Sequence, residues 1–498
     1  MSQINITNLT FAYEGSYDDI FTDVSFQIDT DWKLGFCGRN GRGKTTFLNL
    51  LMGKYEYKGI ISASVNFEYF PFLVTDKNKS TLDILYSIEP NLQIWQIEKE
   101  LSKLAVEDNV LYRAFSTLSN GEQTKILLAG LFLRENNFLL IDEPTNHLDM
   151  ESRHTVAKYL HSKSGFILVS HDRAFLDECI DHILSINKAN IEIQQGNFSS
   201  WYHNKQLQDN FELEQNVKLQ ADIKRLKQAA KKRNEWVGKA EKSLKKKNNS
   251  KVAKHEDINT ADQSRLIAKT AKLQHNIERR QDKALEEKEK LLKNIEEIED
   301  LKIFPLPYHA ARLLSIDNLA VEYDGRKIFR EINFTFDQGD RLALMGGNGS
   351  GKSSILKLIC GEKIPHTGTA KIGSRLTVSY VPQDASFLRG NLNDFIMEKQ
   401  IDEPLYKAIL RKLDFSRIQF EKDMGDYSAG QKKKVLIAAS LCERAHVYIW
   451  DEPLNYIDVL SRMQIEELIL TYKPTLLFVE HDRTFCENIA TKTIILTK

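Results

Sequence analysis

Short apolar runs recur along the chain and alternate with longer patterns typical of helices. The runs KLGFC and RLALM each lead into a glycine-rich turn, which is followed by the helical patterns FLNLLM and ILKLIC. The runs FLLI and VYIW each end in an Asp-Glu pair. Apolar runs of this length are typical of buried strands. Strands that alternate with helices in this way predict α/β domains.

Between the two halves of the chain, the pattern changes to that of long helices. From Phe198 to Phe304 there is no proline and a single glycine. Apolar residues there repeat at steps of seven and four, the spacing of a coiled-coil seam, at Leu266, Leu273, Ile277, Ala284, Leu291 and Ile298. Upstream they repeat at steps of four, three and four, at Leu219, Ile223, Leu226 and Ala230. Two such helices joined by a polar segment predict an antiparallel hairpin, ended by Pro305 and Pro307.

The motifs on either side of this segment are two copies of one set. GRNGRGKTT at 38–46 returns as GGNGSGKSS at 346–354, and LSNGEQTKILLAGLF at 118–132 returns as YSAGQKKKVLIAASL at 427–441. LLIDEPTNHLD and ILVSHDRAFLDE return as YIWDEPLNYID and LLFVEHDRTFCE at nearly the same spacing. A fixed spacing of several motifs indicates a duplicated domain. We expect a first domain at 1–200, a hairpin linker at 201–304 and a second domain at 305–498.

The composition of the chain indicates the class of protein and the compartment in which we expect it. The 498 residues are 42% hydrophobic and 28% charged with a formal net charge of zero, which is typical of a soluble globular protein. No apolar run is close in length to the stretch of about 20 residues that a helix needs to span a bilayer. The N-terminal stretch MSQINITNL does not resemble an export signal. The five cysteines are scattered and lack CxxC spacing, so we expect free thiols and a cytoplasmic location.

The glycine-rich turns match the phosphate-loop pattern GxxxxGK[ST] in the strand-to-helix context that this loop requires. Glycines allow successive backbone N–H groups to face phosphate oxygens at a helix N-terminus. Lys44 and Lys352 would balance phosphate charge, and the hydroxyls of Thr45 and Ser353 would reach Mg²⁺. The candidate ATP-binding residues are Gly38, Asn40, Gly41, Gly43, Lys44, Thr45 and Thr46 in the first copy, and Gly346, Asn348, Gly349, Gly351, Lys352, Ser353 and Ser354 in the second.

The Asp-Glu pairs and two histidines supply the candidate chemistry. Asp142 and Asp451 end apolar strands and are candidates to hold the metal through water. The next residues, Glu143 and Glu452, are candidates to orient and deprotonate the attacking water. The histidines at positions 171 and 481 each precede Asp-Arg, and His171 and His481 are therefore candidates to sense a γ-phosphate.

These motifs together resemble those of ATP-binding cassette ATPases, and the resemblance covers both copied domains. It identifies Ser119, Gly121, Ser428 and Gly430 with the family's signature motif. In that family two domains meet head to tail, so the resemblance implies two composite ATP sites. Lys44, Glu143 and His171 would pair with Ser428 and Gly430, and Lys352, Glu452 and His481 with Ser119 and Gly121. Tyr13 and Tyr323 resemble the adenine-stacking aromatics, and Gln383 resembles the metal-contacting glutamine.

The chain departs from this family pattern at several positions. Phe72 stands where the first copy would carry the counterpart of Gln383. Asn120 and Ala429 replace the first glycine of the signature pair, and Tyr456 replaces the histidine found at position 147. We therefore hypothesise that the two sites are asymmetric in metal handling or hydrolysis rate.

The middle of the linker concentrates positive charge. Residues 224–254 contain thirteen Lys or Arg against Glu235 and Glu241, a net charge of +11. Such a stretch can be a solvated face, or it can bind an anionic partner such as RNA. Trp236 could stack on a base or pack in the hairpin seam. The candidate RNA-binding residues are Lys231, Lys232, Arg233, Trp236, Lys242, Lys245, Lys246, Lys247 and Lys251.

Two such domains joined by a helical hairpin resemble the ABC-F group, and TDWKLGFCGRNGRGKTT, YIWDEPLNYIDV and the flanks GNFSSW and EKEKLLKNIE resemble its Lsa-type antibiotic-resistance factors. The resemblance implies a partner, the bacterial ribosome, which the protein would enter at the exit-tRNA site, near large-subunit RNA and P-site tRNA. It implies protection from lincosamides, streptogramin A compounds and pleuromutilins. It also implies ATP and Mg²⁺ as cofactors and a monomer whose two domains pair.

Three other functions are compatible with parts of this pattern. The first is a housekeeping translation factor of the same fold with no link to drugs. The second is a DNA-associated ATPase, although those proteins usually carry hundreds of residues of coil within a single head. The third is the energy subunit of a transporter, for which the hairpin would have no purpose.

Overall fold

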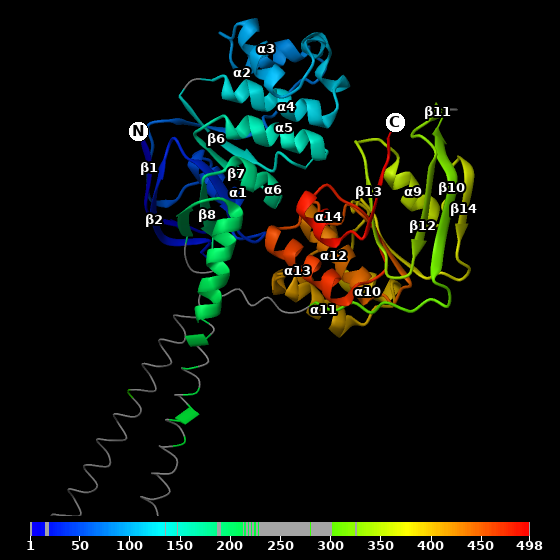
Figure 1. Cartoon of the computed structure of the whole chain (residues 1–498). Coiled ribbons are helices and arrows are strands. Elements are labelled where there is room, and N and C mark those ends of the chain that lie inside the picture. Colours follow the sequence, from blue (N-terminus) through cyan, green and yellow to red (C-terminus); the bar gives the residue numbers. More distant parts are fainter. Residues whose placement is uncertain are drawn as a thin grey trace, which may run out of the picture. The chain divides into compact units, whose positions relative to one another are not determined.

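The computed structural model describes residues 2–14, 19–134, 136–146, 148–186, 191–212, 301–323 and 326–497, with isolated positions at 214, 215, 218, 221, 224, 225, 228 and 279. One compact unit comprises Met1–Asn187, Ile191–Trp201 and Ile298–Lys498, and a second comprises Lys188–Asn190 and Tyr202–Glu297 (Figure 1). The predicted hairpin seam and all the candidate RNA-binding residues, from Lys231 to Lys251, lie outside the described residues.

The first copy is built on a six-stranded sheet of order β5-β6-β7-β3-β8-β9. The first five strands in this order pair in parallel, and β9 is antiparallel to β8. The strands span Lys33–Cys37 (β3), Asn66–Phe70 (β5), Asn137–Asp142 (β6), Phe166–Val169 (β7), His182–Ile186 (β8) and Ile191–Gln195 (β9). All four residues of β7 are buried, as expected for a strand covered on both faces.

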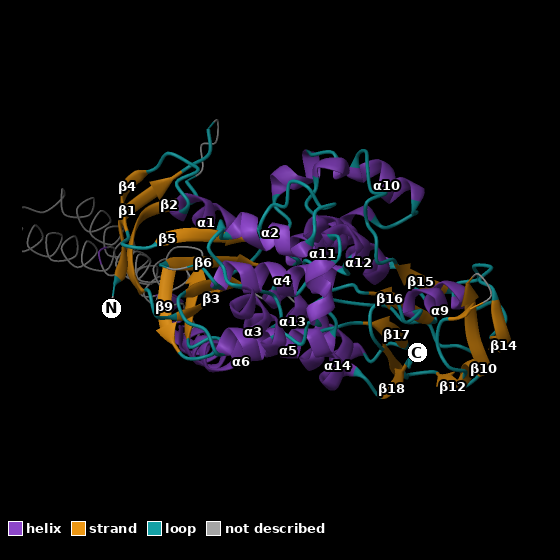
Figure 2. Ribbon diagram, turned by 90° about the horizontal axis from the view of Figure 1, so that it is seen from above, coloured by secondary structure: helices purple, strands orange, loops and turns teal. Residues whose placement is uncertain are grey.

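The second copy repeats this sheet with the order β15-β16-β17-β13-β18, all parallel (Figure 2). Its strands span Arg341–Met345 (β13), Val378–Val381 (β15), Val447–Asp451 (β16), Leu476–Val479 (β17) and Lys492–Ile495 (β18). The strand order of the first copy, from β5 to β8, is therefore reproduced strand for strand. The tandem α/β fold class that the sequence predicts is confirmed.

Each copy also has an antiparallel sheet in which the first strand of the copy is central. In the first copy, β1 (Gln3–Phe11) pairs with β2 (Phe21–Asp29) and β4 (Lys58–Ser62). In the second, β10 (Arg312–Tyr323) pairs with β11 (Arg326–Lys327), β12 (Ile332–Asp337) and β14 (His366–Ile372). Tyr13 lies two residues after the end of β1, and Tyr323 is the last residue of β10.

Helices follow the strands in the same order in both copies. The first contains Lys44–Leu51 (α1), Thr81–Ile88 (α2), Ile94–Lys103 (α3), Asn120–Phe132 (α4), Met150–His161 (α5) and Arg173–Cys179 (α6). The second contains Lys352–Ile359 (α9), Leu392–Glu398 (α10), Glu403–Lys412 (α11), Ala429–Cys442 (α12), Val459–Tyr472 (α13) and Arg483–Ile489 (α14). Among the described residues, no helix combines the length and apolarity needed to cross a membrane.

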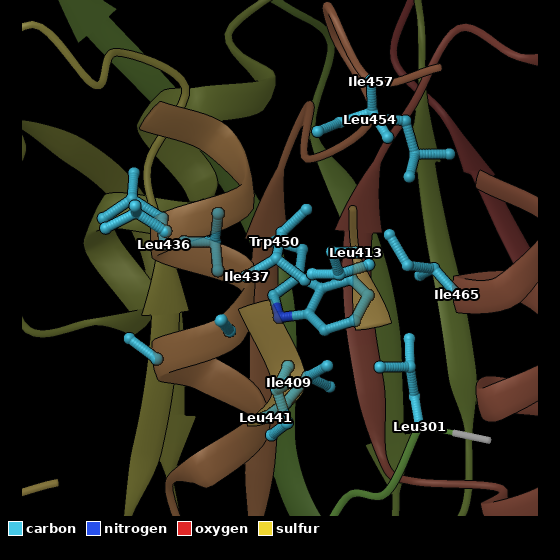
Figure 3. Packing of buried hydrophobic residues seen from close by; sticks show 14 of the residues in the cluster. Leu301, Ile409, Leu413, Leu436, Ile437, Leu441, Trp450, Leu454, Ile457 and Ile465 are labelled. Carbon is cyan, nitrogen blue, oxygen red and sulfur yellow. The ribbon is translucent and has the colours of Figure 1, made fainter. Parts of the chain in front are cut away.

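The core of the second copy fixes the strand that carries its Asp-Glu pair. Trp450 on β16 is fully buried among Leu413, Ile437 and other apolar side chains (Figure 3). Its indole Nε1 donates to Ser440 Oγ at 3.0 Å, so the polar edge of the ring is satisfied inside the core. Since Trp450 directly precedes Asp451, close packing of the ring sets the position of the carboxylate at the strand end.

Candidate active site

The predicted site residues meet at one edge of each central sheet, beyond the carboxyl ends of its parallel strands. In the first copy β3 leads into the glycine-rich loop, β6 ends at Asp142, and β7 is followed by His171. The strands β13, β16 and β17 place the second set in the same way. This edge is where open α/β sheets bind their ligands.

The glycine-rich loops have the conformation that their glycines allow. Gly43 and Gly351 cap α1 and α9 with φ of 93° and 84°, a left-handed conformation that favours glycine. A Cβ at Gly43 would also lie 2.5 Å from Ile20 Cγ2. The buried Lys44 amine donates to Gly38 O at 2.6 Å, and Lys352 donates to Gly346 O at 2.9 Å. Each loop thus surrounds a cation beside a helix N-terminus, an arrangement suited to a phosphate.

The carboxylates that follow β6 and β16 are held in the same way in both copies. Glu143 and Glu452 have φ of 50° and 47°, and each backbone N–H donates to the adjacent strand, to Val169 O at 2.9 Å and to Val479 O at 3.0 Å. Left-handed backbone at a non-glycine residue is uncommon and often occurs at functional sites.

The histidine of each copy faces the glutamate of the same copy. Nε2 of His171 lies 3.4 Å from Oε1 of Glu143, and His481 lies at the same distance from Glu452. All four side chains are largely buried. The structure therefore brings the four candidate catalytic residues together as two matched pairs.

The electrostatic setting of the two glutamates differs. Burial raises the pKa of Glu143 to about 8, and the neighbouring Asp142 acts in the same direction. Burial also acts to raise the pKa of Glu452, but the adjacent His481, a hydrogen bond from Gln383 and the charge of Lys352 lower the pKa to about 2. The glutamate of the second copy is therefore the better stabilised anion.

The oxygen donors at each strand end fit a magnesium ion. Thr45 Oγ1 lies 3.2 Å from Asp142 Oδ2. In the second copy, burial raises the pKa of Asp451 while a hydrogen bond from Ser353 opposes this effect. The buried Asp451 Oδ1 accepts no hydrogen bond. Mg²⁺ takes one or two protein oxygens and completes its shell with water and phosphate. Among the described residues, no group of three or more His, Cys, Asp or Glu could hold a metal.

The candidate signature residues begin helices. Ser119 caps α4 by accepting from Glu122 N at 3.2 Å, and Glu122 Oε2 accepts from Ser119 N at 2.8 Å. Ser428 caps α12 in the same reciprocal way with Gln431. These capping boxes orient the first turns of α4 and α12. The N-terminal N–H groups of both helices are thereby directed to where an anion can bind.

One glycine-rich loop and the opposite signature line a single cavity of about 1330 Å³. From the second copy come Gly347, Asn348, Gly349, Gly351, Lys352, Ser353, Ser354, Gln383, Glu452 and His481, and from the first come Ser119, Asn120, Gly121 and Lys125. The residues of the predicted composite site, among them Lys352, Ser119 and Gly121, thus line one open cavity.

At the other predicted composite site, the glycine-rich loop of the first copy directly contacts residues of the second copy. Asn40 Nδ2, in the first glycine-rich loop, donates to Tyr456 O of the second copy at 2.9 Å. A Cβ at Gly430 would lie 2.4 Å from Tyr456 O and 3.2 Å from Asn40 Nδ2. Gly430 therefore lies against the loop that carries Lys44, and any larger residue would be excluded there.

The candidate adenine aromatics differ in how far the structure describes them. Tyr13 is 41% exposed, and its hydroxyl lies 2.8 Å from Thr46 Oγ1. Its ring also forms edge contacts with Phe11 and Tyr55. For Tyr323 the backbone is described as the end of β10 but the side chain is not.

The structure shows the surroundings of Gln383 and Phe72, the positions at which the two copies depart from one another. Gln383 lines the open cavity and hydrogen-bonds Glu452. Phe72 is half-buried, and the polar contact in its copy comes instead from Tyr69, whose hydroxyl donates to Asp142 Oδ2 at 2.9 Å. Sequence reasoning did not single out Tyr69, although its position three residues before Phe72 in a repeated segment could have indicated it. The position of His147 lies outside the described residues.

Comparison with known proteins matches both copies to one family. Residues 21–146 and 329–455 match the family model described as ABC transporter. Among curated proteins, the ATP-binding protein Uup of Buchnera aphidicola subsp. Acyrthosiphon pisum is 28% identical over 523 residues, which cover 99% of this chain and 80% of that protein. The ribosome protection protein VmlR of Bacillus subtilis is 28% identical over 511 residues, covering 99% and 86%.

Two further comparisons extend the same result. The energy-dependent translational throttle protein EttA of Haemophilus influenzae is 25% identical, covering 95% of this chain and 88% of its own. The crystal structure of archaeal ribosome recycling factor aABCE1, in complex with the ribosomal stalk protein aP1, aligns with a TM-score of 0.63 at 18% identity. That alignment covers 99% of this chain and 87% of the archaeal one, and it shows a shared fold.

Proposed function

This chain belongs to the ABC transporter family as an ABC-F-type ATPase with two ATPase domains, and we propose that it acts on the bacterial ribosome to protect it from antibiotics. The drugs would be those that bind at the peptidyl-transferase centre, namely lincosamides, streptogramin A compounds and pleuromutilins. The main support is the alignment with the ribosome protection protein VmlR, which covers 99% of this chain and therefore includes the linker. A cytoplasmic location is part of this proposal.

In the proposed ATPase cycle each ATP lies between the phosphate loop of one domain and the signature helix of the other. Lys44 and Lys352 balance the phosphate charge, and they are already held beside the loop carbonyls. Glu143 and Glu452 accept a proton from the attacking water, and His171 and His481 lie close enough to orient them. Tyr13 stacks on adenine after its hydroxyl separates from Thr46 Oγ1.

Mg²⁺, when bound, would neutralise part of the charge on the phosphates. The residues proposed to hold it are Thr45 with Asp142 in one site and Ser353 with Asp451 and Gln383 in the other. Their hydroxyl and carboxylate oxygens match the ligand preference of this ion. The remaining ligands would be water and phosphate oxygens.

The proposed coupling to the ribosome follows from the composite sites. ATP draws the two domains together because each nucleotide contacts both, and a ribosome that favours this closed state is bound more tightly when ATP is present. The linker, with its net charge of +11 between residues 224 and 254, would approach ribosomal RNA through the exit-tRNA site. Hydrolysis removes the contact between the domains and releases the protein.

Expression in a susceptible bacterium tests the proposal. We expect growth at higher concentrations of lincomycin, virginiamycin M and tiamulin, and we expect the Glu143→Gln/Glu452→Gln variant to lose this protection. Both proteins should accumulate to equal levels on immunoblots. Unchanged susceptibility with the unmodified chain would refute the protective role while leaving the ATPase assignment in place.

Ribosome binding through the linker has its own test. Changing Lys245, Lys246 and Lys247 to glutamate reverses three charges, and we expect co-sedimentation with large subunits to fall while ATP binding is retained. Changing Lys54, Lys58 and Lys77 of the first ATPase domain to glutamate applies the same charge change elsewhere. Equal retention of both variants on the ribosome would contradict the assignment of the basic segment.

A second candidate is a translation factor without a role in drug resistance. The 25% identity with the translational throttle protein EttA, over 95% of this chain, favours it. It predicts ribosome binding that depends on ATP, together with a change in translation rate and no change in drug susceptibility. The drug panel described above separates the two candidates.

A further inference from the structure

Three positions near the carboxylates distinguish the second ATPase domain from the first. Lys433, Glu480 and Gln383 stand where the first domain has Thr124, Ser170 and Phe72. Two of the three replacements introduce charges of opposite sign into the protein interior, since Lys433 is 2% exposed and Glu480 is 4% exposed. Buried charges are unfavourable unless they are compensated, so their joint occurrence in one domain requires a physical reason.

Lys433 joins two backbone segments that carry site residues. It lies on α12, and its Nζ donates to Pro382 O at 2.9 Å and to Asp451 O at 3.3 Å. Pro382 directly precedes Gln383, and Asp451 directly precedes Glu452. The ammonium group therefore connects the segment that presents the glutamine to the strand end that presents the glutamate.

Glu480 holds the opposite side of the same site. Its Oε1 accepts from Leu454 N at 2.7 Å, and its Oε2 accepts from His481 N at 3.0 Å. Leu454 lies two residues after Glu452 in the turn that follows β16. The carboxylate therefore fixes the backbone of the turn beside the glutamate and the backbone of the histidine.

Neighbouring charges compensate part of the cost of burying each group. Burial lowers the pKa of Lys433 to about 8, and Glu480 is the largest of the carboxylate effects that act in the opposite direction. Burial raises the pKa of Glu480, and the charge of Arg462 is the largest effect that opposes this rise. In the first domain the corresponding residues form neutral hydrogen bonds, from Thr124 Oγ1 to Asn120 O at 2.9 Å and between the hydroxyls of Ser170 and Thr145 at 3.3 Å.

We propose that Lys433 and Glu480 form a buried charged brace that positions Gln383, Glu452 and His481 for ATP hydrolysis in the composite site containing Lys352. Lys433 and Glu480 are positioning residues, since their hydrogen bonds go to backbone groups of the site residues or of their neighbours in the chain. The proposal depends on the roles given above to Gln383 and Glu452. Its consequence is a site whose hydrolytic groups are held in place before ATP arrives.

Replacing buried charges by apolar groups is often neutral or stabilising, so stability alone does not account for Lys433 and Glu480. Displacement of a reacting group by about 1 Å can reduce turnover by about 100-fold. The four hydrogen bonds of the brace join α12, the glutamine segment, the strand end and the histidine, which are the parts whose relative position determines the reaction geometry.

The test uses full-length protein with Glu143→Gln, so that turnover reports the site containing Lys352. In this background we expect Lys433→Met to lower kcat about 10-fold to 100-fold with the KM for ATP changed less than twofold. Lys433→Arg should recover most of the loss because it keeps the charge and the donors. Lys433→Met combined with Gln383→Ala should be no slower than the slower single variant, because both changes remove one positioned group.

Controls separate positioning from stability. Lys433→Thr/Glu480→Ser installs the residues of the first domain and removes both buried charges, so it should fold and show the same loss of kcat. Lys422→Met removes an exposed lysine of the same domain and should leave kcat unchanged. Thermal melting is followed for every variant, and if Lys433→Met does not fold, the Thr/Ser pair decides the question.

Three results would contradict parts of this proposal. A kcat within twofold of the background for Lys433→Met, or for the Thr/Ser pair, would overturn the brace. A loss in Lys433→Met that combines multiplicatively with the loss in Gln383→Ala would also overturn it, because the residues would then act independently. Persistent hydrolysis in Glu143→Gln/Glu452→Gln would instead refute the assignment of Glu452 as the base.

Discussion

At the scale of single residues, the two proposed catalytic glutamates share a backbone conformation but differ in the pKa of the side chain. Burial raises the pKa of Glu143 to about 8, whereas neighbouring polar and charged groups overcome burial and lower that of Glu452 to about 2. A glutamate accepts a proton only when it is ionised. The ionised fraction of Glu143 therefore increases as the pH rises through about 8, while Glu452 is ionised throughout the neutral range.

This difference predicts two pH profiles for kcat/KM, which reports the free enzyme. With Glu452→Gln, only the site containing Glu143 remains active, and kcat/KM should rise about tenfold between pH 7 and pH 9. With Glu143→Gln, the site containing Glu452 should show no such rise. Steady-state ATPase assays in a buffer of constant ionic strength measure both. Parallel profiles would contradict the difference in pKa between the two glutamates in the free enzyme.

The sequence predicted the proximity of the candidate site residues, but it did not predict the individual contacts between them. Lys44, Glu143 and His171 follow strands in motifs that occur twice, and strand ends converge in an α/β sheet, so their proximity could be expected. The bond from Tyr69 to Asp142 could not, because a tyrosine in a strand indicates packing in most cases. Lys433 appears as one lysine in a run of three, and only the fold shows that it points inward.

At the scale of elements, the capping boxes give the signature serines two separable roles. Ser428 accepts from Gln431 N at the start of α12, and the proposed ATP site lies at the same helix end. Asp is as good a helix cap as Ser, but it brings a negative charge. Ser428→Asp should therefore leave the melting temperature nearly unchanged and raise the KM for ATP at the site containing Lys44.

The comparison with Ser428→Ala completes this prediction. Alanine removes the cap, which lowers stability by about 1 kcal/mol, and it introduces no charge near the phosphates. Differential scanning calorimetry and ATPase assays with Glu452→Gln, in which the site containing Glu143 remains, measure the two effects. If Ser428→Asp and Ser428→Ala raise the KM for ATP equally, then loss of the serine hydroxyl explains the weaker binding and the added charge does not.

The elements themselves were predictable where local chemistry determines them. The spacing Ser-x-x-Glu or Ser-x-x-Gln at 119 and 428 is sufficient to begin a helix, and the glycine-rich loops lead into α1 and α9 as their pattern indicates. The antiparallel sheets built around β1 and β10 were not predicted. Their strands pair across long separations, such as Asn5 with Ser62, and no local signal specifies such partners.

At the scale of the whole molecule, the contacts between the two ATPase domains do not follow the duplication of the sequence. Arg173 on α6 forms a buried ion pair with Glu466 on α13, which also accepts from Asn488 Nδ2. The equivalent of Glu466 in the first domain is Ala157. The equivalent of Arg173 is Arg483, which pairs with Glu487 on its own helix and is exposed. Since these partners lie far apart in sequence, a motif comparison could not reveal them.

This asymmetry predicts a large effect of one arginine and a negligible effect of its counterpart. Arg173→Met leaves Glu466 charged and buried without its cationic partner, which should lower the free energy of unfolding by about 3–5 kcal/mol. Arg483→Met removes an exposed pair within one helix, and the unfolding midpoint should stay within experimental error. Arg173→Met/Glu466→Met should recover much of the loss, because two apolar side chains can replace a buried pair. Guanidinium denaturation followed by tryptophan fluorescence measures all three, and equal midpoints for both arginine variants would show that the domains do not depend on this pair.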